Sequence, residues 1–208
     1  MIIHRRSFLH LSALAGASLL AAAGPVLSQQ IDVNEILNDP EAPVAGNVKG
    51  DVTIVAYLDY NCPYCRKTAP DLERIVKTDG KIRLVYKDWP ILSESSVHGA
   101  QLALAAKYQG RYEMAHKALM GIKGRNTTSE DMQRALKKAG VDMARLKADL
   151  ETHGKKISAL LKRNLAQAEA LGINGTPAYL IGPFRTTTLD YEGFKQVVAD
   201  AREAQAGR

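Results

Sequence analysis

The sequence predicts an α/β protein in which a block of helices interrupts a sheet. Two β-branched apolar runs, at residues 52–58 and 82–86, flank a segment whose apolar side chains have helical spacing. Residues 93–172 then contain no strand-like run and are rich in Ala, Leu, Lys and Gln. Strand-like residues return at 178–181. This order, β-α-β, helices, β-β-α, predicts a helical insertion and no linker between independent domains.

Residues 1–28 have the features of a secretory signal peptide. Arg5 and Arg6 precede an apolar run at 11–23, and the segment contains no acidic residue. The run is shorter than the ~18–20 apolar residues of a permanent membrane helix, so cleavage after Ser28 is favoured over a retained anchor. The Arg pair matches a twin-arginine signal in part, which leaves the Sec and twin-arginine routes open. We therefore expect export to the periplasm.

Composition and charge exclude several classes of protein. Hydrophobic residues make up 46% and charged residues 24% of the chain, which excludes a disordered, collagen-like or disulfide-dense chain. The net charge is +6, and it falls to +4 once the two leader arginines are removed. Because no dense basic run accompanies this charge, we expect a mildly basic surface and no nucleic-acid partner.

Residues 29–50 are expected to form a lead-in with one helical turn, and residues 51–92 the first part of the α/β domain. The first β-branched run predicts a strand buried on both faces, and the second run a parallel neighbour. Pro63 suits the first position of the helix between them, because its missing N–H needs no partner there. Pro70 is expected to kink that helix.

The insertion, residues 93–172, is expected to be all-helical. The predicted helices are 96–120, 130–139, 143–152 and 156–171. Thr128 to Asp131 fits a capping box, and Asp142 fits an N-cap. Three glycines are expected at helix ends: Gly140, Gly154 and Gly172.

Residues 173–208 are expected to complete the α/β domain. A strand at 178–181 is followed by a Gly-Pro turn and a partner strand at 184–189. Asp190 is expected to cap a terminal helix.

The two cysteines, Cys62 and Cys65, indicate redox chemistry. A structural disulfide gains most by closing a long loop, and the loop between these residues is nearly the shortest available. A zinc site would need two further ligands. His98, His116 and His153 occur singly in helical segments, where we expect partly exposed helix residues rather than ligands.

A Cys-x-x-Cys at a helix start places its two sulfurs on one face. The first backbone N–H groups of a helix lack internal partners, and together with the helix dipole they stabilise a thiolate at Cys62. Such motifs lower a cysteine pKa from about 8.5 to roughly 3.5–7.5. Cys62 is therefore predicted to be the reactive sulfur, and the less exposed Cys65 the resolving thiol.

Three motifs resemble one known family. Residues 59–65 (DYNCPYC) resemble the active site of DsbA-like thiol–disulfide oxidoreductases of the thioredoxin superfamily, particularly the Com1/ScsC-like branch. Residues 87–92 (KDWPIL) resemble the segment that follows the second strand in that family, and residues 175–179 (GTPAY) resemble its cis-proline loop. The likeness covers residues 40–205 in the expected order.

The resemblance implies a thioredoxin fold with an inserted all-helical domain, and no cofactor or metal. It implies that Pro177 is cis and faces the cysteine pair, and that the backbone of Thr176 pairs with an extended substrate peptide. Pro63 and Tyr64 are expected to tune thiolate stability, and Tyr64 is also a candidate substrate contact.

The sequence departs from the family at one position. The best-known members carry a buried Glu six residues before the first Cys, where this chain has Ala56. A proton relay through that acid therefore cannot be carried over. Asp59 and Lys87 are weaker candidates for a catalytic role. Asp59 is closer to the motif, but acidic residues at strand ends are usually solvated.

These observations predict an exported oxidase that forms disulfides in reduced or misfolded exported proteins. A DsbB-like membrane partner would keep the pair oxidised. A DsbD-like partner would keep it reduced, which favours isomerase or reductase work. A Cu(I)-binding module is a further alternative, because thiolates suit that ion. An inactive interaction domain is disfavoured by the intact motif.

The stretch at 29–51 is short and contains two prolines, so an oligomerisation stalk is not expected and a monomer is predicted. Thr176 favours the isomerase alternative, because the resemblance associates Thr at that position with isomerase-like members.

Overall fold

The computed structural model of the protein describes residues 32–124 and 127–207. The predicted signal peptide lies outside the described residues. Residues 31–208 belong to one compact unit. Along the chain the elements are α1 (Val33–Asn38), β1 (Val44–Gly46), β2 (Val52–Leu58), α2 (Pro63–Asp79), β3 (Ile82–Asp88), α3 (Glu94–Lys107), α4 (Tyr112–Met120), α5 (Ser129–Lys138), α6 (Met143–Ala170), β4 (Ala178–Ile181), β5 (Phe184–Thr186) and α7 (Tyr191–Ala206).

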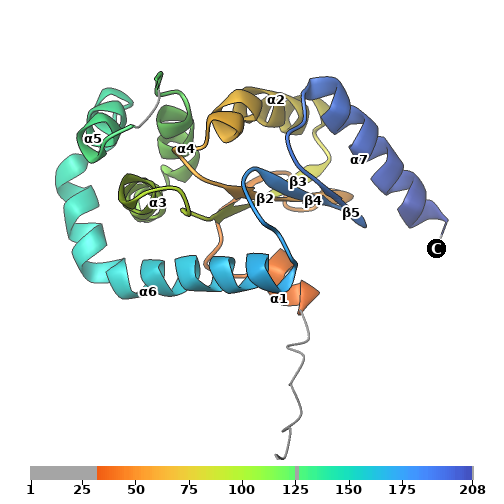
Figure 1. Ribbon diagram of the computed structural model, residues 1–208, viewed down its shortest axis with the longest axis horizontal. Helices are drawn as coiled ribbons and strands as arrows, with labels where there is room; N and C mark the ends of the chain where they lie inside the picture. The colour runs from red at the N-terminus through yellow and green to blue at the C-terminus, as the bar shows by residue number, and fades with distance from the viewer. Residues whose placement is uncertain (1–31, 125–126, 208) are drawn as a thin grey trace, which may run out of the picture. The chain divides into compact units, whose positions relative to one another are not determined.

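The five strands form one sheet in the order β1-β3-β2-β4-β5. β2 and β3 are parallel, as predicted, and the remaining pairs are antiparallel. Helices α2 and α7 cover one face, and α1 with the end of α6 covers the other (Figure 1). The fold is thus α/β, and β2 is the central strand, buried on both faces.

Alternate side chains of β2 enter two separate hydrophobic cores. Ile54 and Ala56 pack in the larger core with α2 and the helices of the 93–172 segment. Val55 and Tyr57 pack in the smaller core with residues of α1 and α6. This alternation is the period-2 pattern of a strand, and it explains why six of the seven residues of the run are buried and only Thr53 is half-buried.

The described elements between β3 and β4 are all helices, and their boundaries differ from those expected. The predicted helix at 96–120 is two helices, α3 and α4, separated at Gly110, which has a φ of +66°. The two helices predicted on either side of Gly154 are one, α6, because tertiary packing outweighs the modest cost of a glycine in a helix interior. The division into an inserted domain and a thioredoxin domain remains a prediction.

Several local predictions are confirmed. Thr128 and Asp131 form the capping box of α5, and Asp142 and Asp190 are the N-caps of α6 and α7. Gly140 and Gly172 follow helices with positive φ. Helix α2 continues through Pro70 without ending there.

Strand β1 was not expected, because three residues of Val, Ala and Gly give no strand signal. It pairs antiparallel with the outer edge of β3, with Val44 opposite Val85. Strand β5 is shorter than the predicted partner strand and ends at Thr186. Both errors fall on edge strands, whose pairing depends on the neighbouring strand more than on their own sequence.

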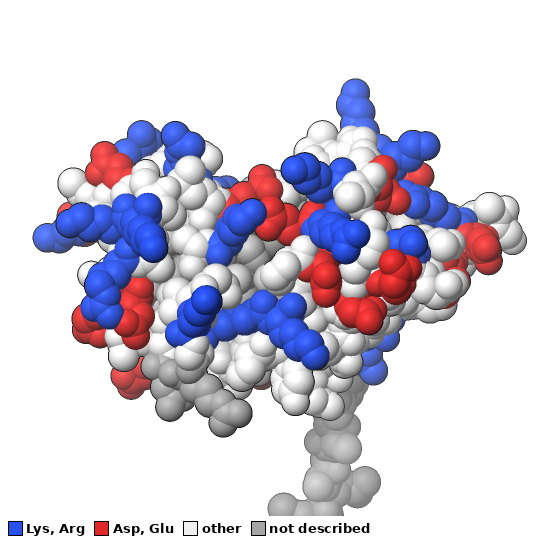
Figure 2. Space-filling model, turned by 90° about the horizontal axis from the view of Figure 1, so that it is seen from above, with Lys and Arg blue, Asp and Glu red and all other residues white. Residues whose placement is uncertain are grey.

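The surface carries charges of both signs. On the face shown in Figure 2, Lys and Arg side chains are interspersed with Asp and Glu. Arg202 on α7 pairs with Asp51 and Asp79 and so connects the terminal helix to the residue before β2 and to the last residue of α2. Exposed pairs of this kind contribute little to stability individually.

Replacing Gly154 with Ala is expected to raise the free energy of unfolding by about 0.5–1 kcal/mol, because Ala is the better helix former. A Cβ at this position meets no atom within 4 Å. The matched control is Gly140→Ala, which also has free space but a φ of +89° and is expected to lose about 1 kcal/mol. Denaturant unfolding measures both, and destabilisation by Gly154→Ala would show that α6 needs flexibility there.

Candidate active site

The two cysteines lie where the central strand β2 passes into helix α2. Cys62 is the N-cap of α2, and its sulfur accepts a hydrogen bond from the backbone N–H of Cys65 at 3.4 Å. Pro63 occupies the first turn, as predicted. Both thiols are free and buried, with Cys62 3% and Cys65 0% exposed. The sequence therefore ranked the exposure of the two sulfurs correctly.

The surroundings of Cys62 favour its thiolate. A hydrogen bond from the Cys65 thiol lowers the pKa of Cys62 to about 6, against the opposing effect of burial. The Thr176 side chain and the N–H groups of Cys65 and Tyr64 lower it further. Burial raises the pKa of Cys65 far above its usual value, and the negative charge on Cys62 adds to this. Of the two thiols, Cys62 therefore loses its proton first, and the remaining proton stays on Cys65.

The loop before β4 faces the cysteine pair. The Thr176–Pro177 peptide bond is cis, as the resemblance implied. The thiol of Cys62 donates a hydrogen bond to the carbonyl oxygen of Thr176 at 3.2 Å. The Thr176 hydroxyl is buried and has no hydrogen-bond partner among the described residues, and its proximity lowers the pKa of both thiols.

The residues between the cysteines point outwards. Pro63 is exposed, and the side chain of Tyr64 is 61% exposed. Tyr64 supplies its backbone N–H to the Cys62 sulfur, while its ring faces solvent. This arrangement leaves the ring free to contact another protein.

Ala56 replaces the buried acid of related proteins with a methyl group. It is fully buried in the centre of the sheet, opposite Tyr86 and Tyr179 on the neighbouring strands. The Tyr179 hydroxyl is hydrogen-bonded to Thr68, one turn beyond Cys65, at 2.7 Å. The hydroxyl that reaches this part of α2 from β4 is therefore a phenol whose pKa burial raises further.

Asp59 is buried, and the expectation that it is solvated is wrong. Its carboxylate accepts hydrogen bonds from the backbone N–H groups of Asn61, Ile91 and Leu92, at 2.7, 2.8 and 3.0 Å. These bonds stabilise a buried charge and join the turn before Cys62 to the segment after β3. The local signal for this arrangement is an Asp directly after a strand, because an Asp side chain often accepts from the backbone N–H two residues further on and so forms an Asx-type turn.

Lys87 is also buried, but it lies on the other face of the sheet. It is level with Tyr57 on β2, and its Nζ lies 3.9 Å from Asp39, which is paired with Arg163 on α6. Burial lowers the pKa of Lys87 to about 8. This placement ties the lead-in to α6 and puts Lys87 on the side of the sheet away from α2.

A buried polar cluster behind the site was missed in the sequence. The Tyr60 hydroxyl is hydrogen-bonded to Nδ1 of His116 at 3.1 Å, and Tyr112 donates to Asp88 at 2.9 Å. His116 is buried rather than partly exposed, and burial lowers its pKa to about 3. Burial likewise raises the pKa of Asp88 to about 7. Helical spacing alone could not distinguish His116 from an exposed histidine.

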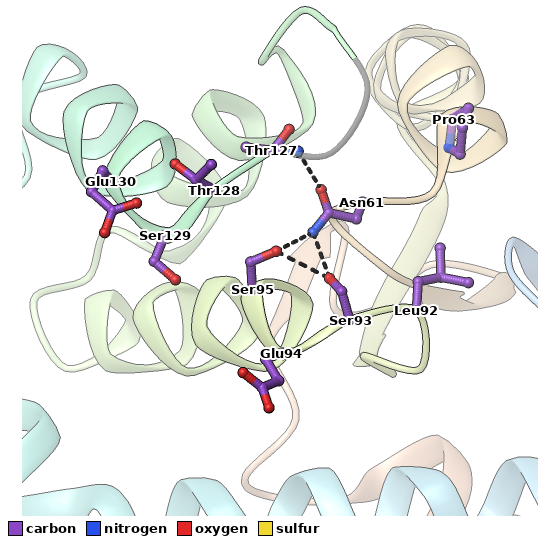
Figure 3. Close-up of a pocket in the computed structure, with 10 residues that line it drawn as sticks. All are labelled: Asn61, Pro63, Leu92, Ser93, Glu94, Ser95, Thr127, Thr128, Ser129 and Glu130. Carbon is purple, nitrogen blue, oxygen red and sulfur yellow. Dashed lines mark hydrogen bonds between the residues drawn. The ribbon is translucent and has the colours of Figure 1, made fainter.

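A cavity of about 700 Å³ opens beside Cys62, where the N-terminal ends of α2, α3 and α5 converge (Figure 3). Six of its ten lining residues carry a hydroxyl or an amide side chain. The lining residues are Asn61, Pro63, Leu92, Ser93, Glu94, Ser95, Thr127, Thr128, Ser129 and Glu130. Within residues 32–124 and 127–207, no three His, Cys, Asp or Glu side chains are grouped as metal ligands require.

The family model described as thioredoxin matches residues 38–200. The chain belongs to the thioredoxin family. It is 38% identical to a thioredoxin-like oxidoreductase from Silicibacter pomeroyi, over 83% of this chain and 98% of that one, with a TM-score of 0.77. It is 26% identical to the thiol–disulfide exchange protein α-DsbA2 from Wolbachia pipientis, over 80% of this chain and 90% of that one, with a TM-score of 0.75.

The chain also resembles the catalytic domain of ScsC from Proteus mirabilis, with 26% identity over 81% of this chain and 93% of that one and a TM-score of 0.68. Two of these neighbours are named for oxidoreductase or thiol–disulfide exchange activity, and the predicted thioredoxin fold and the resemblance to DsbA-like proteins are confirmed.

The curated relatives are much longer proteins. The Na+/H+ antiporter NhaA 1 of Mycolicibacterium gilvum is 26% identical over 175 residues, which cover 82% of this chain and 27% of the antiporter. The chain spans about a quarter of the length of the curated relatives it matches. Among the described residues, none of the helices is long and apolar enough to span a membrane.

Alkylation of Cys62 in the reduced protein is expected to be half-maximal near pH 6, because only the thiolate reacts. Below that pH the rate should fall about tenfold per unit, in proportion to the thiolate fraction. Iodoacetamide labelling followed by mass spectrometry measures this. Cys65→Ser is the control, since it removes the second thiol but keeps a hydroxyl donor. A midpoint near that of an ordinary thiol, about 8.5, would contradict the stabilised thiolate.

Proposed function

We propose that the protein is an exported thiol–disulfide oxidoreductase that introduces disulfides into substrate proteins through Cys62 and Cys65. The observation that carries this proposal is the asymmetry of the two sulfurs. One has a pKa of about 6 and lies at a helix N-terminus, and the other holds its proton. The facing Thr176–Pro177 loop offers a backbone edge to an extended peptide.

Two exchange steps complete the oxidation. A substrate thiolate attacks the Cys62 sulfur, the Cys62–Cys65 bond breaks, and Cys65 leaves and takes up a proton. A second substrate thiolate then attacks the substrate sulfur of the mixed disulfide, and Cys62 leaves as a thiolate. The substrate loses two electrons and two protons, and the cysteine pair gains two electrons. The low pKa of Cys62 favours the second departure.

The same asymmetry supports oxidation as the direction of the reaction. Stabilising the Cys62 thiolate stabilises the reduced protein, which makes its disulfide a stronger oxidant. An oxidase would be reset by a DsbB-like membrane partner, and we propose that it acts as a monomer. The Thr176 residue supports the isomerase alternative, which would require a DsbD-like partner and strong refolding of scrambled substrates.

The redox state of the cysteine pair in cells distinguishes these directions. Trapping with an alkylating probe is expected to find the pair mostly oxidised. Cys65→Ser is expected to accumulate mixed disulfides with substrate proteins, because the resolving thiol is gone, whereas Cys62→Ser forms none. A mostly reduced pair, or an oligomer in light scattering that refolds scrambled substrates efficiently, would identify an isomerase or reductase instead.

Export has its own test. The leader predicts removal of residues 1–28, so N-terminal sequencing of exported protein is expected to begin at Gln29. Lys substitution of Arg5 and Arg6 together is expected to block export only if the twin-arginine route is used. An intact Met1 on a membrane-bound form would show that the segment is an anchor.

A further inference from the structure

Asn61, the residue before Cys62, joins the reactive turn to two other parts of the chain. Its amide nitrogen donates to the hydroxyls of Ser93 and Ser95 at the start of α3, at 2.9 and 2.8 Å (Figure 3). Its amide oxygen accepts from the backbone N–H of Thr127, before α5, at 3.1 Å. The amide therefore both donates and accepts hydrogen bonds, and each of these partners lies more than thirty residues away in the sequence.

Arg66, the residue after Cys65, completes the same network. Its Nε donates to the Tyr60 carbonyl oxygen at 2.7 Å, and its Nη1 donates to the Gly124 carbonyl oxygen at 2.9 Å. Its Nη2 donates to the Asn61 amide oxygen at 3.2 Å and to the Thr127 hydroxyl. The guanidinium thus donates hydrogen bonds both to the turn before Cys62 and to the segment before α5.

Every hydrogen-bond acceptor of Arg66 is neutral. None of the ion pairs among the described residues includes it. Burial lowers the pKa of Arg66, and the negative charges of Asp59 and Cys62 oppose that shift. Because such coupling is reciprocal, the same positive charge stabilises a thiolate at Cys62.

The two side chains of this network belong to the residues directly before and after the cysteine motif. Asn61 and Arg66 flank Cys62 and Cys65, and both side chains turn towards the helical segment rather than towards the sheet. A planar guanidinium, whose N–H donors have fixed directions, is suited to hold such a geometry. A lysine ammonium supplies the charge but lacks these fixed donor directions.

We propose that Arg66, oriented by Asn61, is a positioning residue of the exchange reaction that fixes the Cys62 turn against α3 and the start of α5 and keeps a positive charge beside the reactive sulfur. The proposal rests on the exchange function assigned above to Cys62. It assigns the helical segment a part in setting the reactivity of the cysteine pair.

Arg66→Gln tests the charge. It is expected to raise the pKa of Cys62 by roughly half to one unit and to slow alkylation at pH 6 roughly twofold to fivefold, with little change at pH 9. Lys67→Gln is the matched control: it removes an equal charge one residue along α2, from an exposed side chain without a hydrogen bond among the described residues. It is expected to change the rate less than twofold.

Arg66→Lys and Asn61→Ala test the orientation. Arg66→Lys keeps the charge and is expected to restore part of the alkylation rate at pH 6. Asn61→Ala is expected to lose reactivity in wild type but little more in the Arg66→Gln background, because Asn61 acts through Arg66. Additive effects, or an Arg66→Gln profile identical to that of Lys67→Gln, would overturn the proposal.

Stability and activity are read separately. Thermal unfolding of each variant shows whether it is folded, and if Arg66→Gln is unfolded then Arg66→Lys and the Asn61 variant decide the question. The midpoint of alkylation is therefore compared only among variants that unfold at a temperature close to that of the wild type, because loss of packing around Cys62 would also shift it. Failure of the wild-type protein to oxidise a reduced peptide would refute the proposed function while leaving the alkylation comparison valid.

Discussion

A thiolate buried at Cys62 needs hydrogen-bond donors, and the remaining features of the site follow from how the chain supplies them. The first turn of α2 offers backbone N–H groups that no helix carbonyl can use. Cys62 takes the N-cap position, where a Ser or Asp is usual, and its sulfur accepts from Cys65. The arrangement requires a fixed strand and a fixed turn between that strand and the helix. Burial on both faces holds β2 in place, and the three hydrogen bonds to Asp59 hold the turn before Cys62.

The difference between the two sulfurs arises without a carboxylate beneath them. Ala56 is a methyl group, and Lys87 lies on the opposite face of the sheet. Cys65 keeps its proton because it is buried and because Cys62 is charged. The proton released or taken up at Cys65 must therefore move through the opening at the cysteine pair or through the neighbouring hydroxyls, of which Thr176 faces both sulfurs.

The sequence predicted the parts of this protein that depend on neighbouring residues. The capping box at Thr128, the N-cap at Asp142 and the helix start at Pro63 are local chemistry, and each is confirmed. Gly154 was misread because a helix of 28 residues is held by packing, which local propensity does not contain. His116 and the contacts of Asn61 with α3 and the segment before α5 were missed for the same reason, since the partners lie 32 to 66 residues apart.

Close packing at one glycine allows the helical segment to reach the reactive turn. A Cβ at Gly99 on α3 would lie 2.7 Å from the sulfur of Met132 on α5 and 3.4 Å from the Tyr60 ring. Met132 and Tyr60 are both completely buried in the larger core. A Cβ at 99 would therefore push against the thioether end of Met132 and contact the ring of Tyr60, the residue before Asn61. The glycine lets α3 pack directly against α5 and the reactive turn, where the serines of α3 bond to Asn61, which makes α3 part of the site although it contributes no reacting atom.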